Sequence, residues 1–148
     1  MLQEILKTLF IRDLKKLHKE ISFYKTENNI WITDKEIANS AGNLSLHLVG
    51  NLNTYIGSIL GNTGYIRNRD LEFSLKDIPK TQLLQMINDT INVIEVTIPK
   101  ITDEQLTADY PQLVFENKTT TAYMLTHLAT HLGYHLGQIN YHRRLLDN

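Results

Sequence analysis

The chain has 148 residues, of which 42% are apolar and 21% are charged, and its formal net charge is −1. This length predicts a single domain, residues 1–148, that builds its core without cross-links, and the absence of cysteine excludes thiolate nucleophiles and cysteine-ligated metal sites. The balanced charge argues against nucleic-acid binding, and no stretch reaches the roughly 18 apolar residues of a membrane span. The charged N-terminal sequence is unlike a signal peptide. We therefore expect a cytoplasmic protein that binds neither nucleic acid nor membranes.

Apolar residues at helical spacing predict two helices in the N-terminal part of the chain. The first covers about residues 2–25 and precedes a connector that holds Trp31. The second covers residues 42–60 and ends at the turn-forming sequence GNTG of residues 61–64.

The middle of the chain predicts a loop followed by a third helix. Residues 65–74 are charged and show neither a helical nor a strand period, so we expect an irregular loop there. The third helix is predicted over residues 80–98, because Pro79 suits its start and Pro99 ends it.

A long connection precedes the last predicted helix. Residues 103–117 have no helical period, and Leu113–Phe115 could form a short strand; connections of this length often carry function. The fourth helix is predicted over residues 119–146, with the threonines at 119–121 offering a cap. Four amphipathic helices predict an all-α four-helix bundle with a long connection before the last helix.

Four of the six histidines lie on this last predicted helix, at His127, His131, His135 and His142. At about 100° per residue they share one narrow stripe. Two imidazoles at positions i and i+4 lie one turn apart on one face and can converge on a metal ion. One ion can bind only two neighbouring histidines of this helix, because the others lie too far along the axis. The spacing therefore leaves open whether His127 or His135 joins His131.

His47 is the expected third ligand. It falls on the inner flank of the second helix, between Leu44 and Leu48, where an imidazole without a partner is costly to bury. Alone it would more often be a hydrogen-bonded core histidine, but with His131 and His135 it makes three neutral ligands. Three histidines leave at least one position open, as in catalytic rather than structural sites, and suit zinc, nickel, copper or iron.

Asn51 and Gln138 are candidates for the surroundings of this site. Asn51, one turn after His47, could donate to a metal-bound water or a substrate oxygen, or satisfy a buried carbonyl. Gln138, three residues after His135, could orient an imidazole or be an ordinary exposed side chain.

Arg67 and Arg69 could hold an anionic group of a substrate. Pairing with the neighbouring acids Asp70 and Glu72 is the favoured alternative.

Other features of the last helix also carry expectations. Gly133 and Gly137 are poor helix formers and indicate the close approach of a backbone or a ligand. Tyr134 is predicted to pack, and His142 to lie in the last turn, where a positive charge suits the helix dipole.

The stretches NLSLHLVGNLNTYIGSILG and THLATHLGYHLGQINYHRRLL resemble the DinB-like family of DNA-damage-inducible and YfiT-type four-helix proteins. The family pattern of one histidine on the second helix and His-x-x-x-His-x-Gly-Gln on the last falls on His47, His131, His135, Gly137 and Gln138. The resemblance, loose over the whole length, implies that the histidines bind a divalent metal, often zinc or nickel, and that subunits form homodimers. Some relatives are transferases or isomerases using low-molecular-weight thiols, and others are amide hydrolases.

The sequence therefore predicts a homodimeric bundle with a mononuclear His47, His131 and His135 site. The expected function is that of a metal-dependent hydrolase or thiol-dependent transferase acting on a small molecule, with a low-molecular-weight thiol as a candidate cosubstrate. The alternatives are a non-enzymatic stress-response module that binds a metal or small molecule, and a helical dimer scaffold whose site is vestigial.

Overall fold

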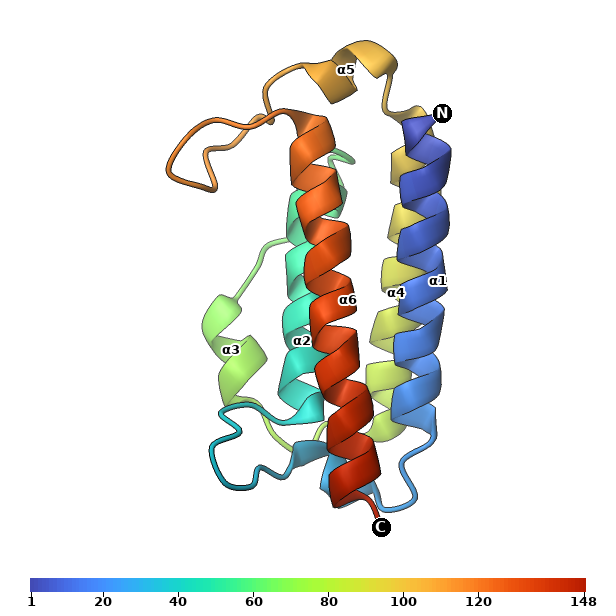
Figure 1. Cartoon of the computed structure of the whole chain (residues 1–148), viewed down its shortest axis with the longest axis vertical. Coiled ribbons are helices and arrows are strands. Elements are labelled where there is room, and N and C mark those ends of the chain that lie inside the picture. Colours follow the sequence, from blue (N-terminus) through green and yellow to red (C-terminus); the bar gives the residue numbers. More distant parts are fainter.

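The computed structural model describes residues 1–148 and confirms the all-α four-helix bundle. Figure 1 shows the long helices side by side, with short helices at the ends and along one flank. The elements are α1 (Leu2–Ser22), η1 (Glu27–Trp31), α2 (Ala41–Leu52), η2 (Asn53–Ser58), α3 (Arg69–Ser74), α4 (Lys80–Thr97), η3 (Ile98–Lys100), α5 (Asp103–Thr107) and α6 (Thr121–Leu146). None of these helices is both long and apolar enough to cross a membrane.

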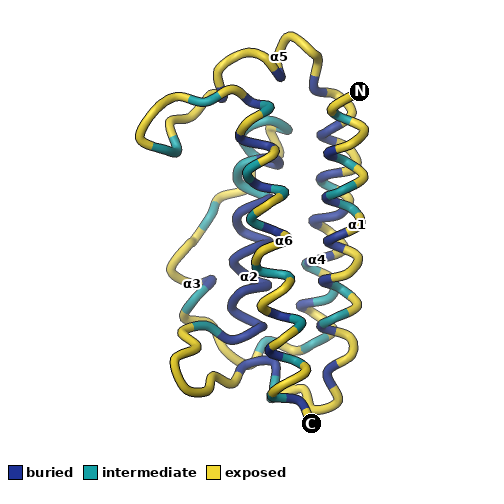
Figure 2. The backbone as a smooth tube through the Cα atoms, in the orientation of Figure 1, coloured by how far each residue is buried: buried dark blue, intermediate teal, exposed yellow.

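α2 is the central element of the bundle, because every residue from Ala41 to Leu52 is buried. Helix α3 packs against it on one side, and α4 and α6 pack against the others; the continuous dark segment of α2 in Figure 2 follows from this enclosure. Polar side chains on α2 therefore need partners inside the protein. One of these side chains is His47.

The predicted second helix, residues 42–60, contains a change of helix type. α2 is regular to Leu52 and then continues as the π-helical turn η2. At this point the Asn53 side chain donates both to the carbonyl oxygen of Val49 and to the hydroxyl of Thr90 on α4, at 2.8 and 2.9 Å.

The expectation of a loop over residues 65–74 is wrong in its second half. Arg69–Ser74 form α3, whose first turn is capped by the side chain of Asn68 accepting from the backbone N–H of Leu71. A helix of six residues has fewer than two turns, which is too short for an apolar period to appear in the sequence.

The long connection before α6 also differs from expectation. Asp103–Thr107 form the short helix α5, which a reciprocal capping box between Thr102 and Gln105 begins. No strand forms at Leu113–Phe115; the only bridge nearby joins Asp109 to Thr120. Val114 and Phe115 instead pack against the core, and Leu113 is exposed, so only part of the apolar run reflects burial.

His142 lies near the C-terminal end of α6, as predicted, but it is a buried residue rather than a charge on the helix surface. It is 4% exposed. Its Nε2 donates to the backbone oxygen of Ile32 at 2.9 Å, so its Nδ1 accepts from the hydroxyl of Tyr24 at 2.6 Å. Both partners, Tyr24 and Ile32, belong to the segment between α1 and α2, which passes the C-terminal end of α6 in Figure 1.

The Tyr24→Phe variant should lower the free energy of unfolding by about 1–3 kcal/mol, because it leaves Nδ1 of His142 buried without a donor. Urea denaturation measures the loss. The matched control is Tyr123→Phe, which removes a hydroxyl from an exposed tyrosine and should stay within about 0.5 kcal/mol of the wild type. Equal stability of the two variants would show that the buried hydrogen bond contributes nothing.

Candidate metal centre

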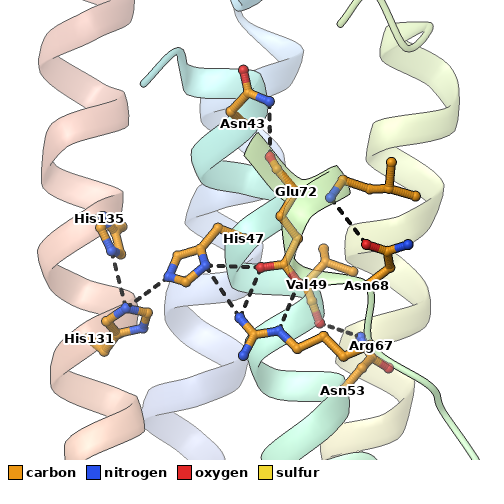
Figure 3. Close-up of polar contacts among 10 residues, drawn as sticks. Asn43, His47, Val49, Asn53, Arg67, Asn68, Glu72, His131 and His135 are labelled. Atoms are coloured by element: carbon orange, nitrogen blue, oxygen red, sulfur yellow. Dashed lines mark hydrogen bonds and ion pairs between the residues drawn. The ribbon is translucent and has the colours of Figure 1, made fainter. Parts of the chain in front are cut away.

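Three histidines from two helices converge beside α3. Figure 3 shows His47 of α2 facing His131 and His135 of α6. The Nε2 atom of His131 lies 3.2 Å from Nε2 of His47 and 3.1 Å from Nε2 of His135. One nitrogen from each ring lies within 4.8 Å of the others. His47 is buried, and the two imidazoles of α6 are half-buried.

The outer nitrogens of two of these rings have partners that determine the tautomer. Nδ1 of His47 lies 3.1 Å from a carboxylate oxygen of Glu72, and Nδ1 of His135 lies 2.7 Å from the amide oxygen of Gln138. Both oxygens can only accept, so each Nδ1 carries the proton. In the neutral rings the two Nε2 atoms therefore present lone pairs toward His131.

His131 cannot satisfy both neighbours as a neutral ring. Burial, followed by the nearby imidazoles of His135 and His47, lowers the pKa of His131 to about 4, so it is uncharged near neutral pH. Its single proton can lie on Nε2, facing one neighbour only, or on Nδ1, which is buried and has no partner. With either tautomer, at least one of the two neighbouring Nε2 lone pairs has no donor.

A cation that accepts the three lone pairs removes this conflict. Nitrogens bonded to one zinc ion at about 2.0–2.1 Å with near-tetrahedral angles lie roughly 3.3 Å apart. The separations from His131 to the other two nitrogens, 3.1 and 3.2 Å, are close to that value, and the third pair lies within 4.8 Å. The donor set and its spacing therefore fit a divalent metal ion, and the cluster could hold one.

Glu72, which sequence analysis treated only as a partner for arginine, orients His47. Its carboxylate accepts from Nδ1 of His47 and from two nitrogens of Arg67, at 2.8 and 2.9 Å. Burial alone would raise the pKa of Glu72, but the hydrogen bonds from His47 and Arg67 and the charge of Arg67 outweigh burial and lower it. An ionised, paired carboxylate thus holds the imidazole, as in carboxylate–histidine–metal arrangements.

Two residues of α2 position Glu72. A Cβ atom at Gly50 would overlap the carboxylate of Glu72, so only glycine leaves room for it there. The side-chain amide of Asn43 donates to the backbone oxygens of Glu72 and Leu75, at 2.9 and 2.8 Å. Gly50 and Asn43, on a buried helix rich in leucine, were the signals that could have pointed to this contact.

The two arginines have different surroundings. Arg67 pairs with Glu72, as favoured from the sequence, and its guanidinium also lies over the ring of Tyr55, at 5.8 Å. Arg69 lies over the ring of Phe73, 5.1 Å from its centre. Neither guanidinium forms a hydrogen bond to His131 or His135.

Gln138, Asn51 and His127 differ in what they contact near the cluster. Gln138 contacts His135, in line with the orienting role considered for it. Asn51 is buried, its Oδ1 has no partner, and it forms no hydrogen bond to the three histidines. The ring of His127 packs edge-to-face on Phe115, at 4.8 Å between centres, and the cluster contains His135 in its place.

Two expectations for α6 are wrong. Tyr134 is 66% exposed and touches the cluster only through the edge of the His135 ring, with 5.2 Å between ring centres. No heavy atom lies within 4 Å of where a Cβ of Gly137 would be, and the nearest to that of Gly133 is an oxygen of Asp13 at 3.9 Å. Both glycines lie on the outer side of α6, so no close approach explains them.

The fold and the site define an all-helical bundle protein with a three-histidine cluster that could hold a metal ion. Residues 2–148 match the model of the family described as Protein of unknown function (DUF1572), and the chain belongs to that family. No protein with a curated description matches it.

Proposed function

We propose that the chain is a metal-dependent enzyme that acts on a small-molecule substrate by hydrolysis or by thiol-dependent transfer. Its divalent cation, zinc or nickel, would be held by His47, His131 and His135. The observation that carries the proposal is the convergence of three imidazoles whose inward-facing lone pairs cannot all be satisfied by the one proton of His131. The cluster includes no fourth protein ligand, a donor set typical of catalytic rather than structural sites.

When bound, such a cation lowers the pKa of water or holds a thiolate at neutral pH and polarises a substrate oxygen. The protein groups around it have separate tasks. Glu72 keeps the proton of His47 on Nδ1, and Gln138 does the same for His135. Arg67 balances the charge of Glu72, so the buried carboxylate remains ionised.

A thiol would have to come from outside the protein, because the chain has no cysteine. This is the reason to include a low-molecular-weight thiol as a candidate cosubstrate. The exposed sides of His131 and His135 would be the approach for it and for the substrate, since His47 is enclosed by α2 and α3.

We also propose that the chain is DinB-like and forms a homodimer. Support for the first comes from one histidine on α2 and His-x-x-x-His-x-Gly-Gln on α6. Support for the dimer is the resemblance alone, and sedimentation velocity at several protein concentrations tests it. A single species of 17.1 kDa at all concentrations would contradict the dimer.

Metal content tests the proposed site. We expect about one metal ion per chain, by elemental analysis, in tag-free protein purified without chelators, and its loss in His47→Ala and His135→Ala, because two imidazoles bind far more weakly than three. The matched control, His127→Ala, removes a histidine of the same helix outside the cluster and should keep the metal. The loaded protein is then screened for hydrolysis of amides and esters and for conjugation of thiols.

If the wild-type protein takes up neither zinc nor nickel, the proposed metal-dependent function is wrong. The non-enzymatic binding module and the dimer scaffold would then remain.

A further inference from the structure

A cavity of about 860 Å³ adjoins the histidine cluster on one side. It lies between the loop of residues 35–39 and the C-terminal half of α6, and His135 and Gln138 are at the end nearest the cluster. Leu44, three residues before His47 on α2, also lines it. The cavity therefore continues the space in front of His135 toward the C-terminal end of the bundle, and its volume is in the range of small-molecule sites.

The wall of this cavity away from the cluster is apolar and aromatic. Tyr141 and Leu145 project from α6 and are 64% and 63% exposed, and Ile37 faces them from the loop. Large apolar side chains gathered and exposed around one concavity mark a binding surface more often than single exposed residues do. Together with buried Leu44, they offer a tail-sized apolar surface to a ligand.

Polar groups of the lining come from both α6 and the loop. His142 also lines the wall, but both of its ring nitrogens are already bonded to Tyr24 and Ile32, so it offers a ligand no free hydrogen-bonding group. The only charged residues of the lining are Lys35 and Glu36, one of each sign, at the loop. The cavity thus has polar groups at the histidine end and, on the loop, Asn39 and two opposite charges, while the rest of its lining is apolar or aromatic and carries no net charge.

We propose that this cavity binds the uncharged alkyl or aryl tail of the substrate, and that the polar reacting group of the same molecule lies at the histidine cluster. The substrate class is a small amphipathic molecule with a polar head and an apolar tail. The inference rests on the proposed metal-dependent function, to which it adds the determinant of substrate choice. From His135 to Leu145 the helix rises about 15 Å, enough for a medium-length chain or an aromatic ring.

The test uses hydroxamates, whose head group chelates zinc, with tails of increasing length. Zinc-loaded wild-type protein is titrated calorimetrically with acetohydroxamate, hexanohydroxamate and octanohydroxamate. Each added methylene should tighten binding about threefold to fourfold while it is buried, giving a decrease in Kd of at least roughly 100-fold from the shortest to the longest tail. An eight-carbon hydroxamate ending in a carboxylate should bind more weakly than octanohydroxamate, because the charge would leave water for a largely apolar cavity whose one lysine, Lys35, is next to Glu36 in sequence.

Variants locate the effect in the cavity. Tyr141→Ala and Ile37→Ser should weaken octanohydroxamate about 5-fold to 20-fold and leave acetohydroxamate unchanged. The matched control is Tyr123→Ala, which removes an exposed tyrosine of α6 that lies outside the cavity and should change neither ligand.

The outcomes separate the two proposals. If acetohydroxamate binds but affinity does not rise with tail length, or if Tyr141→Ala and Tyr123→Ala behave alike, the cavity is not the tail site. If no hydroxamate binds protein incubated with zinc, the proposed metal site itself is wrong, and the tail site is rejected with it.

Discussion

The His131→Ala variant is expected to lose the stabilisation that zinc gives to the wild type. Free zinc at about 100 times Kd should stabilise the wild-type fold by about 2.7 kcal/mol, which corresponds to about 5–11 °C in Tm for a chain of this size. His131 lies between the other two imidazoles and is within 3.2 Å of each. Removing a residue that only orients a ligand weakens metal binding about 10-fold to 100-fold. Loss of His131, a ligand itself, should weaken it more. Thermal unfolding with and without zinc measures the difference.

The metal-free form of the same variant distinguishes a ligand from a core residue. Nδ1 of His131 is buried without a partner, and its Nε2 faces two lone pairs. Truncation therefore removes at most one hydrogen bond, and metal-free His131→Ala should lie within about 1 kcal/mol of the metal-free wild type. A variant that is several kcal/mol less stable without metal, yet still gains the full increase in Tm with zinc, would assign His131 a structural role.

Removing the carboxylate of Glu72 should affect both stability and metal affinity. Glu72→Ala leaves the guanidinium of Arg67, whose side chain is 14% exposed, without its ionic partner. Breaking a buried ion pair from one side lowers the free energy of unfolding by about 3–5 kcal/mol. Loss of the acceptor for Nδ1 of His47 should weaken zinc binding about 10-fold to 100-fold. Urea denaturation measures the first effect, and competition with a chromophoric chelator measures the second.

Conservative variants separate the two roles of Glu72. Glu72→Gln keeps an oxygen that can accept from His47 but loses the charge that pairs with Arg67. It should therefore retain more zinc affinity than Glu72→Ala while still losing stability. If Glu72→Gln and Glu72→Ala bind zinc equally and as tightly as the wild type, Glu72 does not orient the imidazole.

A pair of glycine variants supplies a control for this prediction that leaves Glu72 itself unchanged. Alanine at Gly137 meets no atom within 4 Å, and the better helix former should stabilise α6 by about 0.5–1 kcal/mol. Alanine at Gly50 overlaps the carboxylate of Glu72 and must push it away from His47. We expect weaker zinc binding in Gly50→Ala and unchanged binding in Gly137→Ala. Unchanged binding in both variants would show that the position of the Glu72 carboxylate does not affect zinc affinity.

The long helices and the three histidines were accessible from the sequence because their signals are local. A buried helix face repeats its apolar residues over many turns, whatever element covers it, so α1, α2, α4 and α6 show a period. Spacing of four residues puts His131 and His135 on one face. His47 could be added because an imidazole on the inner flank of a buried helix needs a partner.

Packing between elements decided what surrounds those histidines. Glu72 reaches His47 across 25 residues, from a helix too short to show a period, and only because Gly50 has no side chain. The choice of His135 over His127 depended on how α6 lies against α2, since both histidines have the same spacing from His131. Such contacts depend on how two surfaces fit together at close packing, which no pattern within one segment of the chain contains.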